Sequence, residues 1–513
     1  MKNKIHIITY ADSLGENLNE LDLVLEKYFR DIVGGVHILP FYPSSGDRGF
    51  APVTHLEVDS KFGNWEDIQK LSKKYIVTAD IMVNHISTKS FFFRDYLEKG
   101  DESKYADYFV TSDKFSRRIL PCRKKSLIIL NFIEKIINNF RNFDKIFHTT
   151  GVNKFSFKKI YRPRSESPFI PFVFKDGTIK HFWCTFTKEQ VDLDFCNEEV
   201  KNFLKEYIIK LAQNGIKIIR LDAVGYTIKK RGTNSFMLPE TYDLIDWLSK
   251  VAHENGMLSL PEIHNHYDYQ VELSNMKEVD FVYDFQIPLL ILNAIYNKDV
   301  TTIKKWLKIR PENTINVLDT HDGIPIVDVK DLLAKSEIAE TSKKIILNGG
   351  NEAKRASGNN EVSNVDTYQI NCTYYSALRE NDDDYIVARA IQFFIPGISQ
   401  VYYVGLLAGK NDVDKLRETN IGRDINRHNY TIKEIENEME RIIVKRLMRL
   451  MKFRNEYPVF DGKFTVEKSS NKKLIFKWFK EKLFFEVIID LEKKKVKAYF
   501  VDEKSGKEKT IEF

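Results

Sequence analysis

The sequence predicts an α/β fold, a (β/α)8 TIM barrel that carries two inserted subdomains and is followed by a small C-terminal antiparallel β domain. The first observation behind this prediction is that short apolar strands alternate with amphipathic helices, and eight such strands can be counted. The second is a change to period-two alternation after about residue 455. No Gly-x-Gly-x-x-Gly follows the first strand, which argues against a dinucleotide-binding sheet.

Strand, helix and strand in succession predict a parallel sheet with right-handed crossovers. The expected strands are Lys4–Tyr10, Gly35–Pro40, Ile76–Asn84, Ile216–Asp222, Met257–Ile263, Asp280–Phe285, Thr314–Asp319 and Ile398–Tyr403. The expected helices are Asn17–Tyr28, Asn64–Tyr75, Glu198–Asn214, Pro239–Asn255, Thr301–Lys308 and Asp384–Phe394. The barrel is therefore expected to comprise 1–85, 197–322 and 381–455.

Two long interruptions predict the insertions. Over a hundred residues separate the third strand from the helix at 198, which is too long for a simple loop. We expect subdomains at 86–196 and 323–380, and the β domain at 456–513. The basic stretch 118–155 has two interpretations: a solvated surface insertion, which we favour, or extra positive charge near a binding site.

Composition limits the kinds of partner. The chain has 513 residues, 43% of them hydrophobic and 30% charged, as in globular proteins of several domains. A formal net charge of +6 is too small for this length to indicate nucleic acid. No uncharged apolar run of about 18 residues is present, so we expect no membrane span. The four cysteines show no metal spacing and are expected to be reduced, which favours a cytoplasmic location. A monomer or homodimer is expected.

Charged residues cluster where the predicted strands end. Arg220 and Asp222 are two apart in a strand and share a face; alone, they could equally be a structural ion pair or catalytic residues. In a barrel, catalytic groups stand at the carboxyl ends of the strands. The residues expected at this end are Asp47, His85, Arg220, Asp222, Glu262, His321 and Asp322. So many polar residues at equivalent positions favour catalysis over support of the fold.

Two carboxylates with a third nearby are the groups that cleave a glycosidic bond. Arg220 on the same face favours the ionised form of Asp222, which suits a nucleophile. The apolar residues before Glu262 are expected to raise its pKa, which suits a proton donor. Asp322, beside His321, is expected to bind sugar hydroxyls and favour the transition state.

Four motifs resemble the α-amylase superfamily. They are Asp80-Ile-Met-Val-Asn-His85, Ile219-Arg-Leu-Asp-Ala223, Pro261-Glu-Ile-His264 and Leu318-Asp-Thr-His-Asp322. Further stretches, among them Gly46-Asp-Arg-Gly-Phe-Ala-Pro52 and Gly422-Arg-Asp-Ile-Asn-Arg-His428, resemble its sucrose phosphorylase branch. The resemblance extends from residue 1 to about 455.

The resemblance implies a retaining double displacement that transfers α-glucosyl from sucrose to inorganic phosphate, giving glucose 1-phosphate and fructose. Asp222 would be the nucleophile, Glu262 the acid/base and Asp322 the transition-state stabiliser, and no cofactor or metal is implied. The glucose subsite would comprise Asp47, Phe50, His85, Phe186, Arg220, Tyr226, His321, Asp322 and Arg423. The acceptor side would comprise Tyr161, Pro163, Arg164, Asp366, Tyr368 and Gln369.

Alternatives remain open at this point. The donor could be sucrose 6'-phosphate or another α-glucoside, although Tyr368 instead of the His expected for sucrose 6'-phosphate indicates unmodified sucrose. A barrel without catalysis, serving as a scaffold, is disfavoured because the carboxylate trio is complete. His264 and His266 could bind a metal, but a local hydrogen-bonding role is preferred. Lys229-Lys230-Arg231 is typical of a solvated edge.

Overall fold

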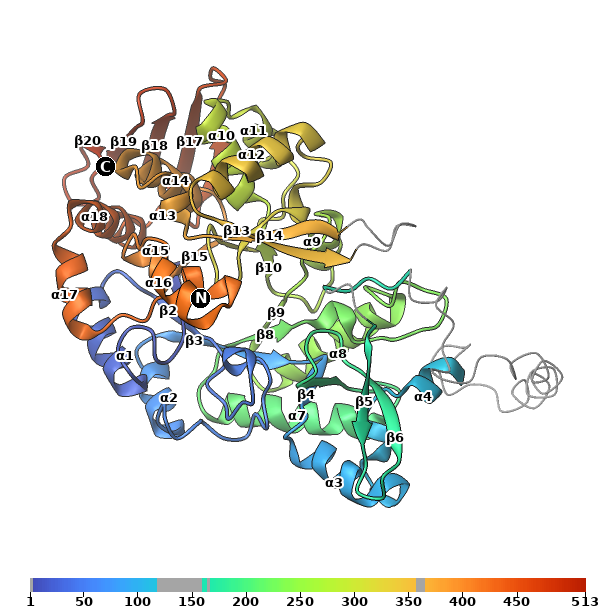
Figure 1. Cartoon of the computed structure of the whole chain (residues 1–513). Coiled ribbons are helices and arrows are strands. Elements are labelled where there is room, and N and C mark those ends of the chain that lie inside the picture. Colours follow the sequence, from blue (N-terminus) through green and yellow to red (C-terminus); the bar gives the residue numbers. More distant parts are fainter. Residues whose placement is uncertain (1–2, 118–158, 164–166, 357–364) are drawn as a thin grey trace.

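The computed structural model describes 3–117, 159–163, 167–356 and 365–513. The basic stretch 118–155 and Arg164 lie outside the described residues. In Figure 1 the barrel strands run through the middle of the molecule, with helices of the two halves of the chain around them.

The predicted barrel is present. Its strands are β1 (His6–Thr9), β2 (Gly35–Ile38), β3 (Ile76–Met82), β8 (Ile218–Asp222), β9 (Leu258–Pro261), β10 (Val282–Asp284), β11 (Thr314–Asn316) and β15 (Ile398–Tyr402). They form one eight-stranded parallel sheet in the order β10-β11-β15-β1-β2-β3-β8-β9. A single backbone hydrogen bond, from Phe281 N to Ser259 O at 3.2 Å, joins β9 to β10 and nearly closes the ring. All eight expected strands are confirmed.

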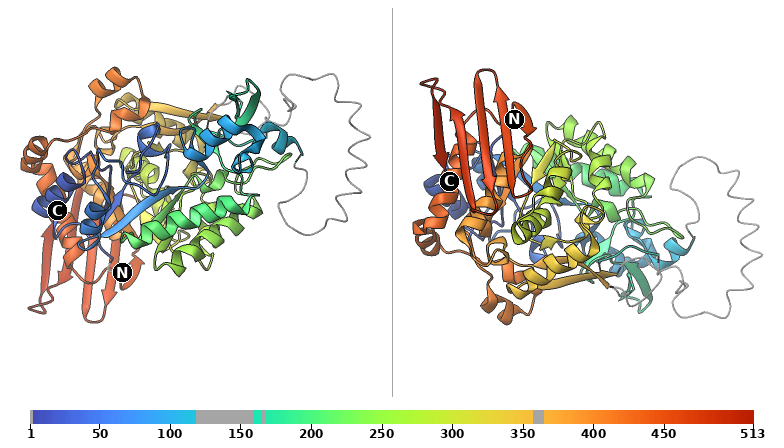
Figure 2. Two further views of the ribbon diagram at one scale, coloured as in Figure 1. Left: turned by 90° about the horizontal axis from the view of Figure 1, so that it is seen from below. Right: turned by 90° about the horizontal axis from the view of Figure 1, so that it is seen from above.

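The expected helices are also confirmed, with boundaries within a few residues: α1 (Leu18–Val24) continuing as η1 (Leu25–Phe29), α2 (Trp65–Ser72), α7 (Glu198–Gln213), α8 (Pro239–Glu254), α11 (Thr301–Trp306) and α14 (Asp382–Phe394). Local signals fix their starts. Asn64 and Asp67 form a capping box at α2, and Pro239 is the first residue of α8, where its missing N–H costs nothing. Figure 2 shows α7 and α8 side by side on the outside of the barrel.

Not every helix of the barrel was predicted. α10 (Ile287–Asn297) follows β10, and nine of its eleven residues are buried. Its sequence is apolar on all sides, so no 3.6-residue alternation marks it as a helix. The other helices are α3 (Phe91–Lys99), α4 (Ser112–Arg117), α9 (Asp268–Ser274), α12 (Lys335–Leu347), α13 (Tyr374–Ala377), α15 (Tyr403–Leu406), α16 (Val413–Thr419), α17 (Ile432–Glu440) and α18 (Ile442–Glu456). Short 3-10 turns are η2 (Asp47–Gly49), η3 (Gly100–Glu102), η4 (Ala106–Tyr108), η6 (Val224–Tyr226), η7 (Val327–Val329) and η8 (Gly422–Asn426).

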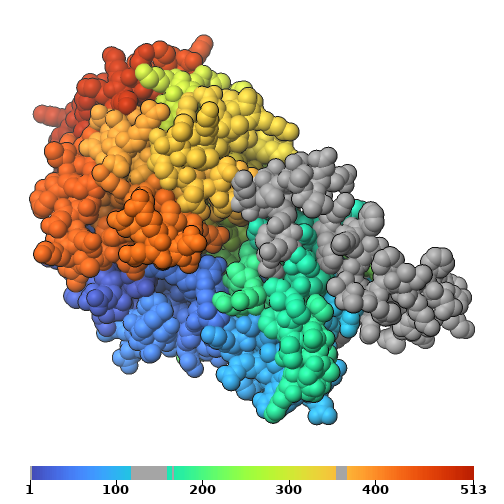
Figure 3. All heavy atoms as spheres, viewed as in Figure 1, coloured from blue at the N-terminus to red at the C-terminus, as the bar shows by residue number. Residues whose placement is uncertain are grey.

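The two long interruptions form small sheets of their own. In the first, β4 (His85–Ser87) pairs with β7 (Gln190–Asp192), and β5 (Phe169–Val173) pairs with β6 (Ile179–Trp183). In the second, β14 (Val365–Asn371) lies between β12 (Ile324–Pro325) and β13 (Asn351–Ala356). The Asn351 side chain donates to the carbonyl of Gly422 in η8 at 3.1 Å, and Figure 3 shows the yellow and orange segments in contact there.

The C-terminal region is an antiparallel sheet of five strands, as expected. Its strands are β16 (Lys463–Val466), β17 (Lys473–Lys480), β18 (Leu483–Asp490), β19 (Lys495–Val501) and β20 (Glu508–Glu512), paired in this order. One face packs on α14, where the Trp478 indole donates to the carbonyl of Phe394 at 2.8 Å. Figure 2 shows this sheet at one end of the molecule, with both chain termini near it.

No described helix is long and apolar enough to cross a membrane. Cys184 and Cys372 are buried, and Cys196 is disulfide-bonded. The expectation that all the cysteines are reduced is therefore wrong for Cys196, and with it the cysteine argument for a reducing compartment weakens.

Candidate active site

One guanidinium organises the carboxyl end of the barrel. Arg220 Nη1 lies 2.8 Å from Asp222 Oδ1 and also contacts Asp80, and its Nη2 lies 2.8 Å from Glu262 Oε1. Its side chain is only 3% exposed. The parallel register opposes Asp80 to Arg220 across β3 and β8, and Glu262 follows the next strand, β9. Arg220 thus binds three carboxylates from three neighbouring strands.

Glu262 has a second cationic neighbour. His264 Nε2 lies 3.4 Å from Glu262 Oε1, and its Nδ1 lies 3.5 Å from Asp328 Oδ2. The imidazole stacks on Phe285 with ring centroids 3.8 Å apart. Although burial opposes protonation, Asp328 and Glu262 raise the pKa of His264 to about 10. The imidazolium form therefore dominates at neutral pH.

The expected apolar setting of Glu262 is wrong. Burial alone would raise its pKa, but Arg220 and His264 outweigh burial and lower the pKa of Glu262 to about 2. The pKa of Asp222 is raised well above its usual value, first by burial and then by the charge of Glu262. In the substrate-free site, Asp222 is therefore the more basic of the two carboxylates and Glu262 the more acidic.

Asp322 stands in a strongly cationic environment. Arg423 Nη1, from η8, lies 3.1 Å from its Oδ1, and Arg427 Nη2 lies 4.0 Å away. His321 Nε2 is 3.7 Å from the other oxygen. Burial works against ionisation, yet Arg423 and these neighbours hold the pKa of Asp322 far below its usual range. Asp322 is thus ionised at neutral pH.

The structure brings the predicted catalytic trio together. An oxygen of Glu262, an oxygen of Asp322 and a nitrogen of His264 lie within 4.8 Å of one another, and Arg220 joins Asp222 to Glu262. A small hollow opens among these residues. It is lined by Ile8, Arg220, Glu262, His264, Tyr283, Phe285, Thr320, His321 and Asp322.

Glu262, His264 and Asp322 also have the residue types of a metal site. The carboxylates, however, already face cations: Arg220 Nη2 is 2.8 Å from Glu262 and Arg423 Nη1 is 3.1 Å from Asp322. A divalent ion would be repelled by both guanidinium groups, so the donor set does not fit a resident metal.

Three residues predicted for the glucose subsite, Arg220, His321 and Asp322, line this hollow, and the others contact them or one another. Phe50 stacks on His321 with centroids 4.8 Å apart, and its carbonyl lies 2.8 Å from His85 Nε2. The centroid of the Phe186 ring lies 5.3 Å from the ring centroids of both His85 and Tyr226. The last predicted member, Asp47 in η2, lies 3.8 Å from Arg423.

The residues predicted for the acceptor side are less completely described. The Tyr161 hydroxyl donates to the carbonyl of His264 at 3.2 Å, and the Tyr368 ring meets the His264 ring edge-on at 5.7 Å. Gln369 is fully buried and accepts from Gly323 N at 3.3 Å. Pro163 lies half-buried two residues beyond Tyr161. Asp366 lies in β14, where only its backbone is described.

Sequence reasoning missed several members of the site. Asp80, which also pairs with His37 at 2.8 Å, and Asp328, the partner of His264, were not singled out. The period-two spacing of Glu262 and His264 placed both on one face and could have indicated their contact. Lys229 was assigned to a solvated edge, which is wrong: its side chain is 1% exposed and pairs with Asp192 at 2.6 Å.

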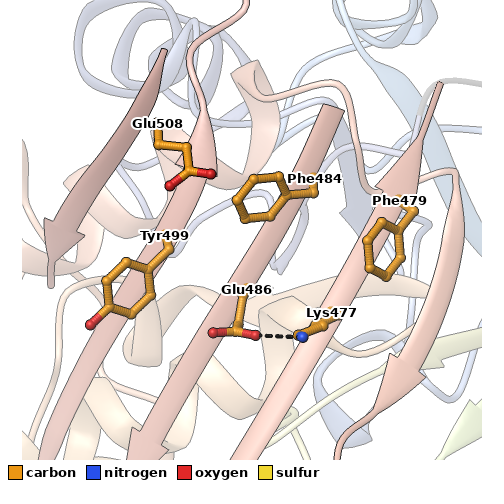
Figure 4. Close-up of a pocket in the computed structure, with 6 residues that line it drawn as sticks. All are labelled: Lys477, Phe479, Phe484, Glu486, Tyr499 and Glu508. Carbon is orange, nitrogen blue, oxygen red and sulfur yellow. Dashed lines mark ion pairs between the residues drawn. The ribbon is translucent and has the colours of Figure 1, made fainter. Parts of the chain in front are cut away.

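A second hollow lies away from this site, on the outer face of the C-terminal sheet (Figure 4). The half-exposed rings of Phe479, Phe484 and Tyr499 surround the ion pair of Lys477 with Glu486, at 2.8 Å. Its lining does not bring together three carboxylates around a buried arginine, as the barrel site does.

A parallel barrel with three carboxylates at its strand ends has the architecture of an enzyme that acts on glycosidic bonds. The chain belongs to the alpha-amylase family, whose catalytic-domain model matches residues 5–329, and within it to the sucrose phosphorylase branch. It is 44% identical over 468 residues to sucrose phosphorylase from Streptococcus mutans, covering 91% of this chain and 90% of that protein.

Two more relatives match nearly end to end. Glucosylglycerol phosphorylase from Marinobacter adhaerens is 39% identical over 515 residues, covering 100% of this chain and 99% of the relative. The crystal structure of sucrose 6F-phosphate phosphorylase from Thermoanaerobacter thermosaccharolyticum superposes with a TM-score of 0.91 at 40% identity, covering 100% and 99%. The chain is accordingly an enzyme that transfers glucosyl groups.

Proposed function

We propose that the protein is a sucrose phosphorylase, a hexosyltransferase that moves an α-glucosyl group from sucrose to inorganic phosphate with retention. In the first step an oxygen of Asp222 attacks the anomeric carbon, the bond to fructose breaks, and Glu262 gives its proton to the departing oxygen. In the second step a phosphate oxygen attacks the same carbon, Asp222 leaves, and the phosphate proton passes to Glu262. The products are fructose and α-glucose 1-phosphate.

The single observation that carries the proposal is the placement of Asp222 and Glu262 on two nitrogens of one guanidinium, each at 2.8 Å. A retaining mechanism needs two carboxyl groups about 5–5.5 Å apart, and neighbouring strands provide such a separation. Asp322 is ionised and close to Glu262, so it suits the stabilisation of positive charge developing on the sugar ring.

The mechanism requires the order of the two pKa values to reverse when substrate binds. In the free site Asp222 is the more basic carboxylate and Glu262 the more acidic, whereas a nucleophile must be ionised and a donor protonated. Two coupled carboxylates titrate as a pair, so the position of their proton depends on what lies between them. We propose that a bound glucoside, which inserts between the two groups, transfers the proton to Glu262.

Phosphate is favoured as acceptor by positive charge on the Glu262 side. His264, with a pKa of about 10, is a buried cation 3.4 Å from Glu262. An anionic acceptor that approaches Glu262 gains from this charge, whereas water does not. Arg164, a predicted phosphate ligand through two parallel hydrogen bonds, lies outside the described residues.

The donor is the finer question. Relatives named for sucrose, sucrose 6F-phosphate and glucosylglycerol are similar to this chain at 39–44% identity. We prefer sucrose because position 368 is Tyr, where relatives that prefer sucrose 6'-phosphate are expected to carry His. Tyr368 packs against the cationic His264 and adds no charge for a second phosphate. A phosphorylase of sucrose 6'-phosphate or of another α-glucoside is the second candidate.

The deciding experiment measures product from each donor with and without inorganic phosphate. Sucrose with phosphate should yield glucose 1-phosphate and fructose in equal amounts. Faster turnover of sucrose 6'-phosphate or glucosylglycerol would assign the second candidate. Release of free glucose at a rate independent of phosphate would assign a hydrolase, and no turnover of any glucoside would indicate a scaffold. We further propose that the enzyme acts in the cytoplasm as a monomer or homodimer. Its partners are small molecules, and it uses no cofactor and binds neither nucleic acid nor a membrane.

A further inference from the structure

The feature that the proposed reaction leaves unexplained is a buried lysine. Lys229 follows Tyr226 by three residues in the loop after β8. Its ammonium lies 2.6 Å from Asp192 Oδ2 and donates to Asn84 Oδ1 as well. Both members of the ion pair are closed off from solvent, with side chains 1% and 0% exposed. Burying an ammonium costs free energy of desolvation, whereas a lysine at a solvated edge would not have that cost.

The partners of Lys229 belong to different parts of the chain. Asn84 follows the barrel strand β3, and Asp192 ends β7 in the first insertion. The Asn84 amide nitrogen also donates to Asp192 Oδ2 at 3.0 Å. Lys229 therefore joins three segments, the end of β3, the insertion and the loop after β8, through one charge.

Each partner of Lys229 is linked to a residue predicted to touch the glucosyl ring, either directly or through one hydrogen bond. Asn84 precedes His85, and the Asn84 amide lies 3.4 Å from His85 Nδ1. Asp192 accepts from the backbone N–H of Thr185 at 2.9 Å, and Thr185 precedes Phe186. Displacing either partner of Lys229 would therefore displace His85 or Phe186.

We propose that Lys229 is a positioning residue for the glucosyl donor. Its ammonium locks Asp192 and Asn84 together, and this sets His85 and Phe186 against the same sugar ring. The role rests on the proposed glucosyl transfer, but it concerns only the glucose side of the site. It is therefore the same whichever group leaves and whichever acceptor follows.

The charges around His85 provide a second readout. It is faced by Asp192 from β7, Asp47 from η2, Lys229 from the loop after β8, and His55. Burial lowers the pKa of His85, Asp192 and Asp47 oppose this, and Lys229 adds to the lowering. Removal of the ammonium while the ring stays buried should therefore raise the pKa of His85.

The test uses Lys229→Met, with Lys230→Met as the matched control because Lys230 pairs with Glu240 on a more exposed surface. Hydrolysis of α-glucosyl fluoride reports on the donor side without any acceptor. We expect Lys229→Met to lower kcat/KM by about 100-fold, mainly through KM, as for displacement of a positioning contact by about 1 Å. Lys230→Met should behave as wild type.

Two further arms keep the proposal falsifiable. If Lys229→Met does not fold, the double variant Asp192→Asn/Lys229→Met removes the unpaired charge, and its donor KM should still be raised. A wild-type donor KM in either variant overturns the proposal. If wild-type protein does not hydrolyse glucosyl fluoride, the proposed function fails instead. The pKa of His85, followed by NMR of labelled histidine, does not depend on glucosyl transfer: a pKa no higher in Lys229→Met than in wild type would overturn the proposal.

Discussion

Replacement of His264 by glutamine tests the electrostatics of the site most directly. The side chain is 5% exposed and lies between Asp328 and Glu262, which raise its pKa from 6.5 to about 10. Since one pKa unit corresponds to about 1.36 kcal/mol, the folded state favours the imidazolium by about 5 kcal/mol. Glutamine keeps polar atoms at this position but cannot carry the charge.

The sign and the pH window follow from linkage. A group whose pKa is raised on folding stabilises the protein fully below its unfolded pKa, here 6.5, and this contribution disappears as the pH rises through 10. The loss in the free energy of unfolding caused by His264→Gln should thus be about 5 kcal/mol at pH 5, about 4 kcal/mol at pH 7 and about 1.4 kcal/mol at pH 9.

Urea unfolding of both proteins at the three pH values measures this difference. His253→Gln is the matched control, since His253 also pairs with two carboxylates, Glu278 and Asp280, but is partly exposed, in the last turn of α8. Its effect should be smaller because solvent screens the pairs. A loss for His264→Gln that is equal at pH 5 and pH 9 would refute a charged imidazolium between the two carboxylates.

Four other predictions concern single groups. Asp222→Ala should abolish transfer while far-UV circular dichroism stays unchanged, and Glu262→Gln should lower kcat by about 10²–10⁴-fold for donors with poor leaving groups. Arg423→Ala should raise the pKa of Asp322, because it removes the nearest cation, so the acidic limb of the kcat/KM profile should move to higher pH; an unmoved limb would contradict this. Burial raises the pKa of Cys372 to about 12, so it should react with a thiol reagent at pH 8 only after unfolding, as mass spectrometry of the labelled peptide can show.

The barrel could be predicted because parallel strands are buried on both faces and therefore appear as short apolar runs between amphipathic helices. The same logic placed polar residues at the carboxyl ends, and the structure brings them together. α10 (Ile287–Asn297) escaped because it is buried on nearly every side and loses the helical period. Sequence neighbours also misled for Glu262: Leu258 and Leu260 precede it, but its contacts come from Arg220 on the adjacent strand and from His264.

The misassigned Lys229 has the same explanation. A basic triplet in sequence looks solvated, and nothing local announces that Asp192, 37 positions earlier, will approach from an insertion. Such pairings depend on tertiary topology, which a single sequence does not display. The pKa order of Asp222 and Glu262 was inaccessible for the same reason, because it depends on which cation each carboxylate meets.

The ring of strands has one weak joint. Seven of its eight strand-to-strand contacts are ladders, whereas β9 and β10 share one backbone hydrogen bond, from Phe281 to Ser259. Side-chain bonds from Ser259 to Asp280 and Glu278 supplement it, and the joint begins three positions before Glu262. Amide hydrogen–deuterium exchange in the barrel strands should therefore be fastest at this joint, close to Glu262.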